Sequence, residues 1–230
     1  MIILNKLSEL FNINGDKSPM QSLGDAITVG NNKKALKLIP QCKDIDNNSG
    51  IVPPLLLAIS NKNITVVNAL LEADANPNIC RTFTKFKPLE LALLHDFFEG
   101  AISLVEKGAD VKGITHKEKD AFLNVTLSKA TTTSKPKNSK DEESYLRLIQ
   151  AMVNKGADVN KRNKGGLTPL EQLMPISQEN KFLKDIAKTL VKGGAKLNPR
   201  DAQHLEDCGV SISTKSISTE NLKNKTSPSR

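Results

Sequence analysis

The residues from Ala58 to Asn78 read AISNKNITVVNALLEADANPN, and their spacing predicts a helix that ends in a tight turn. Apolar residues of the second half stand three and four positions apart, so a helix over about 64–73 would present them on one face. These residues are Val66, Val67, Leu70 and Leu71. Asp74 comes next, and Asp tolerates the left-handed backbone that often ends a helix. The stretch therefore predicts an amphipathic helix that needs a neighbour to cover its apolar face.

Parts of this stretch recur along the chain. The pattern returns 34 positions later, with ALLH beginning at Ala92 and LVEKGADV ending at Val111. Two further endings, VNKGADVN and LVKGGAKLN, finish at Asn160 and Asn198, and a degenerate copy, CKDID, begins at Cys42. Self-similarity at a period of roughly 20–50 residues indicates a protein built from stacked repeats.

These residues resemble the ankyrin repeat, whose pattern has a Thr-Pro-Leu-His helix start and a Gly-Ala-Asp-Val-Asn ending. Thr168-Pro169-Leu170-Glu171 matches the start best, while KPLE at 87–90 and PPLL at 53–56 keep its Pro-Leu. The resemblance covers about residues 23–198 and implies an all-α solenoid. We expect about five helix-turn-helix repeats with short hairpin-like loops and terminal capping helices. The family's His is replaced in all three copies, so the hydrogen bonds that it makes between repeats are not expected here.

Local physics favours the same elements. Proline in the first turn of a helix loses no hydrogen bond, and glycine takes the left-handed conformation at helix ends most easily. Gly108 and Gly156 stand at such ends. Each helix pair alone would expose apolar surface, which only stacking on a neighbouring pair can bury.

The repeat endings divide the chain. We expect an N-terminal capping helix over 1–20, a repeat domain over 21–210 and a disordered polar tail over 211–230. The repeats fall at about 21–46, 47–78, 79–112, 113–160 and 161–198, with a C-terminal cap over 199–210. An insertion at 128–140, rich in Ser, Thr, Lys and Pro, is expected to stay unordered between helices at about 117–128 and 141–154.

The composition predicts a soluble chain without a secretory leader or a membrane span. Three distant cysteines, Cys42, Cys80 and Cys208, give no disulfide framework and favour a reducing compartment. The net charge of +8 is compatible with an acidic partner, but the lysines are spread among Asp, Glu and Asn over every segment. A solvated surface is therefore favoured over a nucleic-acid footprint, which stays a weaker alternative.

No motif for phosphate binding, zinc hydrolysis or a serine nucleophile occurs, so we expect no catalytic residue, cofactor or metal. His204 and Cys208 are four residues apart and would share one face of the last helix. One interpretation makes that pair a capping-helix face. The alternative is an enzyme of unrecognised type that uses Cys208 and His204, or the inserted loop.

Candidate partner-binding residues lie at two kinds of position, as expected for such arrays. The finger at 79–87 carries two aromatic rings among cations, which are typical of interfaces unless the rings fold back onto neighbouring repeats. The finger at 161–166 is basic and flexible, although a solvated turn would look the same. At the loop-facing ends of the inner helices we expect further contacts on the concave side. The candidates are Arg81, Phe83, Lys85, Phe86, Lys161, Arg162, Lys164, Ser60, Asn61, Leu94, His95 and Asp96.

These features predict a monomeric, cytoplasmic protein-interaction module. Lysine greatly outnumbers arginine and Asn is abundant, which is associated with AT-rich genomes. Short, degenerate ankyrin proteins of intracellular bacteria have this composition, and many are translocated into host cells, where they bind host proteins. One setting is therefore a bacterial effector acting on a host protein, and the other is an ordinary cytosolic scaffold or regulator.

Overall fold

The computed structural model describes residues 17–46, 52–80, 86–115, 120–133, 138–174 and 179–212, and most of these residues are helical. The all-α fold is confirmed: these ranges contain ten α-helices, and their β-structure is limited to isolated bridges such as Ile114–Ala121. The chain divides into two units, Met1–Asn76 and Pro77–Arg230. The capping helix expected over 1–20 lies mostly outside the described residues, and most of the tail, 213–230, also lies outside them.

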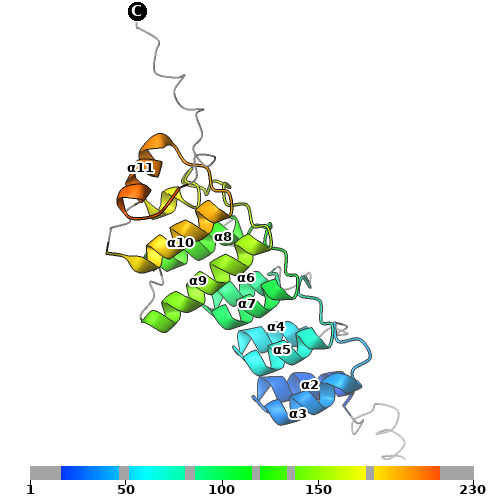
Figure 1. The fold of residues 1–230 in the computed structure, drawn as a ribbon. Helices are drawn as coiled ribbons and strands as arrows, with labels where there is room; N and C mark the ends of the chain where they lie inside the picture. Colours follow the sequence, from blue (N-terminus) through cyan, green and yellow to red (C-terminus); the bar gives the residue numbers. More distant parts are fainter. Residues whose placement is uncertain are drawn as a thin grey trace, which may run out of the picture. The chain divides into compact units, whose positions relative to one another are not determined.

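The first unit contains two helix pairs. Its helices are α2 (Pro19–Thr28), α3 (Asn32–Leu38) with the 3-10 turn η1 (Ile39–Gln41), α4 (Pro54–Ser60) and α5 (Ile64–Glu72). Within the unit, α2 packs beside α4 and α3 beside α5, so the first and second helices form separate layers (Figure 1). The four apolar residues expected on the face of α5 are buried, as the periodicity predicted.

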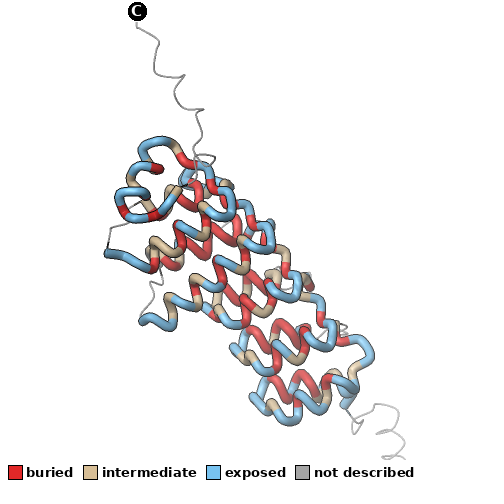
Figure 2. Tube along the Cα trace, viewed as in Figure 1, coloured by how far each residue is buried: buried red, intermediate tan, exposed pale blue. Residues whose placement is uncertain are grey.

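The second unit continues the pattern of paired helices, and its helices α9 and α10 are longer than those of the first unit. Its helices are α6 (Pro88–Leu94), α7 (Phe98–Glu106), α8 (Phe122–Ser128), the π-helical segment η2 (Lys129–Thr133), α9 (Ser139–Asn154), the 3-10 turn η3 (Glu171–Leu173), α10 (Lys181–Lys192) and α11 (Pro199–Asp207). The outer helix α9 packs between α7 and α10 (Figure 1). Buried positions lie on the faces where these helices meet (Figure 2).

The turns after the outer helices confirm the helix-end prediction. Gly108, Gly156 and Gly194 have φ angles of 95°, 85° and 90°, and Asp74 takes the same position with a φ of 60°. Each is followed by an alanine whose N–H bonds back to a carbonyl of the last helical turn, as Ala109 does to Leu104 at 2.8 Å. The ending Gly-Ala, or Asp-Ala after α5, therefore stops these helices and leads the chain into the next loop.

Asparagine side chains tie consecutive repeats together. The Asn78 amide donates to the Gly108 carbonyl at 3.0 Å and accepts from the Asp110 N–H at 2.7 Å. Asn160 makes the equivalent pair of bonds later in the array, donating to the Gly194 carbonyl at 3.0 Å and accepting from the Lys196 N–H at 2.8 Å. These side chains link repeats although the family's His is absent.

The inserted segment differs in part from the expectation. Its first residues, 129–133, continue α8 as a π-helix, and Ala130 is only 3% exposed. The Lys129 ammonium reaches the Asp96 carboxylate at 2.7 Å, in the turn before α7. A buried methyl group and an ion pair to the preceding repeat thus order a stretch that its composition predicted to be unordered. Residues 134–137 lie outside the described part.

The best match to the family's helix start also differs. Thr168 and Glu171 cap each other, with the Thr168 N–H donating to Glu171 Oε2 at 2.7 Å and the Glu171 N–H to Thr168 Oγ1 at 3.2 Å. The helix that this cap begins is only the 3-10 turn η3, and residues 175–178 lie outside the described residues. A good start signal fixes where a helix begins but not how far it runs.

A row of aromatic rings joins the outer helices of the second unit. The Tyr145 ring on α9 lies 4.2 Å from the Phe98 ring and 6.5 Å from the Phe182 ring, measured between centroids. Tyr145 is 1% exposed. Burial raises the pKa of its hydroxyl far above the usual value of 10.0, and the negative charges of Asp96 and Asp141 raise it further.

Alkali should therefore unfold the second unit before it ionises the folded tyrosine. The neutral phenol contributes its full stability below pH 10, and this contribution is lost as the pH rises above that value. Because Tyr145 is the chain's one tyrosine, tyrosinate absorbance reports this residue alone. We expect that absorbance to appear only together with the loss of helical circular dichroism. A midpoint near about pH 10 with the helices intact would contradict the burial.

Candidate functional site

The loops that precede the inner helices α8 and η3 form two neighbouring fingers, whose described residues are 107–115 with 120–121, and 155–170. In the first, Ile114 and Ala121 form an antiparallel bridge, and the Thr115 N–H donates to the Asp120 carbonyl at 2.8 Å. The fingers touch each other, because the Lys164 N–H donates to the Asp120 carboxylate at 3.3 Å. The Asn124 amide on α8 also donates to the Lys161 carbonyl of the second finger at 2.8 Å. The described parts of the two fingers therefore form one continuous edge.

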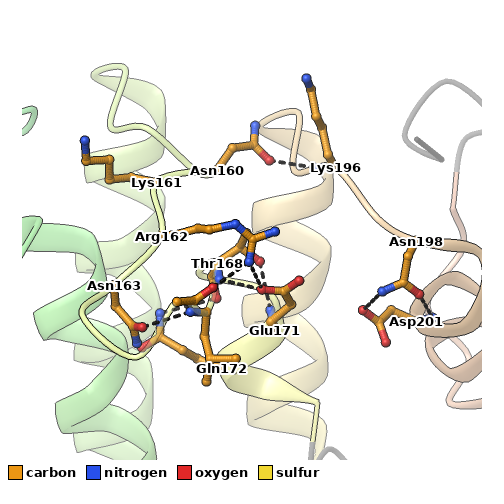
Figure 3. Close-up of polar contacts among 12 residues, drawn as sticks. Asn160, Lys161, Arg162, Asn163, Thr168, Glu171, Gln172, Lys196, Asn198 and Asp201 are labelled. Atoms are coloured by element: carbon orange, nitrogen blue, oxygen red, sulfur yellow. Dashed lines mark hydrogen bonds and ion pairs between the residues drawn. The ribbon is translucent and has the colours of Figure 1, made fainter. Parts of the chain in front are cut away.

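The finger 155–170 is held by its own hydrogen bonds. Asn163 closes it, because its N–H donates to the Leu167 carbonyl at 2.8 Å and its side chain accepts from the Leu167 N–H at 3.0 Å. The Arg162 guanidinium lies 2.9 Å from the Glu171 carboxylate, whereas Lys161 and Lys196 point away from this network (Figure 3). Arg162 is thus part of the finger's framework, although its side chain remains 59% exposed.

Acidic side chains along this edge accept hydrogen bonds from groups of the same loops. Asp110 accepts from the Lys87 ammonium at 2.9 Å and from the Lys112 N–H at 2.9 Å, and the Lys87 contact is the main reason why the pKa of its carboxyl lies below the usual value. Asp120 and Asp158 accept backbone N–H groups of Ala121 and Asn160 at 2.9 and 2.8 Å. The carboxylates therefore stabilise the loops that carry them.

Several lysine side chains on the same edge do not stabilise the loops through ion pairs among the described residues. Within the described ranges, no carboxylate forms an ion pair with the ammonium groups of Lys112, Lys161, Lys164 or Lys196, and all four residues are exposed. Two large apolar residues are exposed beside them, Ile114 at 55% and Leu167 at 44%. We call Lys112, Ile114, Lys161, Lys164, Leu167 and Lys196 the finger surface.

The proposed concave contacts lie elsewhere than expected. Ser60 and Leu94 end α4 and α6, and the fingers precede the first residues of the inner helices, so these positions stand at the helix ends away from the fingers. A helix of seven residues places its ends about 10 Å apart. The prediction of loop-facing positions was therefore wrong. Asp96 is engaged by Lys129, and His95 is half-buried at the end of α6.

Asn61 is similarly committed to the scaffold. Its amide donates to the Ile27 carbonyl at 2.9 Å, which joins the turn after α4 to the end of α2 within the first unit. Ser60 beside it is exposed. Of this pair, only Ser60 offers a side chain without a structural hydrogen bond in the described part of the chain.

Of the aromatic finger at 79–87, Phe86 is described, whereas Arg81, Phe83 and Lys85 lie outside the described residues. Phe86 is half-buried and faces a cavity of about 10 Å³, which is room for a single water molecule. The cavity is also lined by Glu90, Leu93, Leu94, Thr115, Val125 and Lys129. Phe86 therefore folds back against the inner helices, which was one of the two possibilities for it.

The cysteine and metal sites considered from the sequence give no evidence of catalysis or metal binding among the described residues. Cys208 is 5% exposed at the end of α11, in keeping with a capping position. Among the described residues, no group of three His, Cys, Asp or Glu side chains could hold a metal ion. No helix in the described ranges is long and apolar enough to cross a membrane.

A groove of about 670 Å³ runs between the outer helices α9 and α10. Leu146 and Val153 supply apolar surface, while Lys188 and Lys192 line the α10 side. Lys188 is paired with Asp185 at 3.1 Å. A methyl group on Gly193 would lie 2.5 Å from the Val153 side chain, so the glycine allows the two helices to approach. The groove is a second surface on which a partner could be tested.

Residues 53–82 match the family model of the ankyrin repeat. A Rickettsia felis protein described as an ankyrin repeat protein is 33% identical over 150 residues, which cover 64% of this chain and 60% of that protein. The paired helices and their Gly-Ala endings agree with these matches, which support an ankyrin-repeat fold. The chain spans less than two thirds of the relative that it matches.

The ankyrin pattern could have pointed to part of the finger surface. Ile114 and Leu167 each follow a glycine within a finger, and large apolar residues at loop positions have no core to fill. Lys112 and Lys196 follow the Gly-Ala endings closely. Sequence alone does not show which charged side chains form ion pairs within the loops. It could not distinguish Arg162, which is paired with Glu171, from Lys161 and Lys164, which have no such pair among the described residues.

Proposed function

We propose that the chain is a protein-interaction module that binds its partner through the repeat loops and the exposed ends of the inner helices. The observation that carries the proposal is the finger surface, where cations and apolar side chains face solvent on an internally hydrogen-bonded edge. Ankyrin repeats expose successive loops on one scaffold and are suited to such binding. The residues concerned are those of the finger surface together with Arg81, Phe83, Lys85 and Ser60.

Affinity capture tests this function. The tagged chain is incubated with host-cell lysate and with bacterial lysate, beside a variant with Arg81→Glu, Phe83→Ala and Phe86→Ala whose circular dichroism matches the wild type. We expect one partner to be retained in near-stoichiometric amount and to copurify again after expression with the chain alone. Failure to retain any protein from either lysate would contradict a binding function.

We further propose that the partner is a host protein and that the chain acts as a bacterial effector. The Lys- and Asn-rich composition and the similarity to a Rickettsia felis protein support this setting. A translocation reporter fused to the chain tests it, since an effector should deliver the reporter into the host cytosol through a secretion system. Signal that stays in the bacterium would instead support a cytosolic scaffold or regulator.

An enzyme that uses Cys208 and His204 is the competing function. The burial of the Cys208 thiol at the end of α11 disfavours it, because a nucleophile needs access to its substrate. A protein with Cys208→Ala and His204→Ala should retain partner binding and any cellular effect. Loss of the effect with binding intact would restore the enzymatic alternative.

A further inference from the structure

In the described part of the second unit, the large apolar side chains that are exposed lie on the fingers. A single exposed leucine or isoleucine is common on any protein surface and carries little information. In the described ranges of Pro77–Arg230, however, the large apolar residues that are clearly exposed are Ile114 and Leu167, one on each of two touching fingers. Because these fingers touch, the two side chains mark a place where apolar groups of a partner would be buried.

On this edge the carboxylates form hydrogen bonds within the fingers, whereas the lysine ammonium groups form no ion pairs among the described residues. Asp110, Asp120, Asp158 and Glu171 each accept a hydrogen bond from a backbone or side-chain donor of the fingers. The ammonium groups of Lys112, Lys161, Lys164 and Lys196 have no ion-pair partner among the described residues. A carboxylate from another protein would therefore meet positive charge that the fold has not neutralised.

We infer that the finger surface binds an acidic protein segment that also carries large apolar side chains. This inference rests on the proposed function and specifies its partner. Carboxylates of the segment pair with Lys161, Lys164 and their neighbours, and its apolar side chains cover Ile114 and Leu167. Nucleic acid fits less well, because binding of single strands relies on exposed aromatic rings for stacking, and the described parts of these two fingers expose none.

Selection of peptides from a random displayed library tests the inference on the whole chain. The test variant combines Lys161→Glu, Lys164→Glu and Leu167→Ser. The matched control combines Lys33→Glu, Lys37→Glu and Leu36→Ser on α3, where both lysines are exposed and Leu36 is 40% exposed. The two variants have the same net charge and lose one exposed leucine each, and both must keep the wild-type circular dichroism.

We expect the enriched peptides to be acidic and to contain Leu, Ile, Phe or Trp. Synthetic copies should bind the finger variant at least about tenfold more weakly than wild type, bind the α3 variant equally, and weaken as salt rises. Peptides without acidic enrichment, or ones unaffected by the finger variant, would overturn this inference and leave the binding module standing. Enrichment of no peptide at all would count against both the acidic-segment inference and the proposed binding function. Tighter binding of a single-stranded oligonucleotide at the same residues would also overturn it.

Discussion

Replacing Phe122 with alanine should lower the free energy of unfolding of the second unit by about 3–5 kcal/mol. Phe122 begins α8 and is fully buried, and every residue from Ala121 to Leu127 is buried as well. An inner helix of this kind is covered on all sides, so the substitution leaves a cavity that cannot refill easily. The chain has no tryptophan and one tyrosine, so the fluorescence of Tyr145 reports the unfolding of this unit alone.

Urea titration followed by that fluorescence gives the measurement. The midpoint should fall while the slope of the transition stays the same, as expected when stability changes without a change in the surface exposed. Leu167→Ala is the matched control, because it also truncates an apolar side chain but at a 44% exposed position. We expect it to change stability by no more than about 0.5 kcal/mol. A similar loss in both variants would mean that α8 is not the centre of the core.

The double variant Asn78→Ala, Asn160→Ala should destabilise the second unit by about 2–4 kcal/mol. Each asparagine donates to the carbonyl of a turn glycine and accepts from an N–H two residues further on. Truncation leaves both backbone groups without their partner, and water replaces the lost bonds only in part. The two bridges lie at different repeats, so their effects should add.

Asn68→Ala serves as the control for that variant. Asn68 is exposed on the outer face of α5, and its side chain makes no hydrogen bond in the described part of the chain. The same urea titration, read by circular dichroism so that both units are seen, should show no change for it. Double-variant stability within about 0.5 kcal/mol of wild type would show that packing alone holds the repeats together.

Much of the fold could be predicted because the repeat has strong local signals. The apolar spacing of α5 and the Gly-Ala endings at Gly108 and Gly156 reflect physics that acts within a few residues. The insertion was harder to predict. Its first residues are ordered through the contact of Lys129 with Asp96, 33 positions earlier, which no local pattern reveals.

The candidate surface was predicted less well for a related reason. Positions on the finger 155–170 were found from its charge. The structural roles of Arg162 and Asn61 were not, because Arg162 pairs with Glu171 and the Asn61 amide bonds to the Ile27 carbonyl in another helix. Ile114 and Leu167 were missed although each follows a glycine within a finger, because only the packed structure shows that their side chains are exposed. The concave residues were misplaced because each short inner helix runs away from its finger, which puts its last residues at the far end.

Hydrogen exchange of the amide groups, with and without the captured partner, tests binding through the fingers most directly. We predict slower exchange at 109–115 and 160–168 on binding, with α9 and α10 unchanged. Because the finger amides that do not bond internally face solvent in the free chain, protection there can come only from contact with the partner or from its ordering of the loops. Protection confined to the groove between α9 and α10, with both fingers unchanged, would contradict a finger interface.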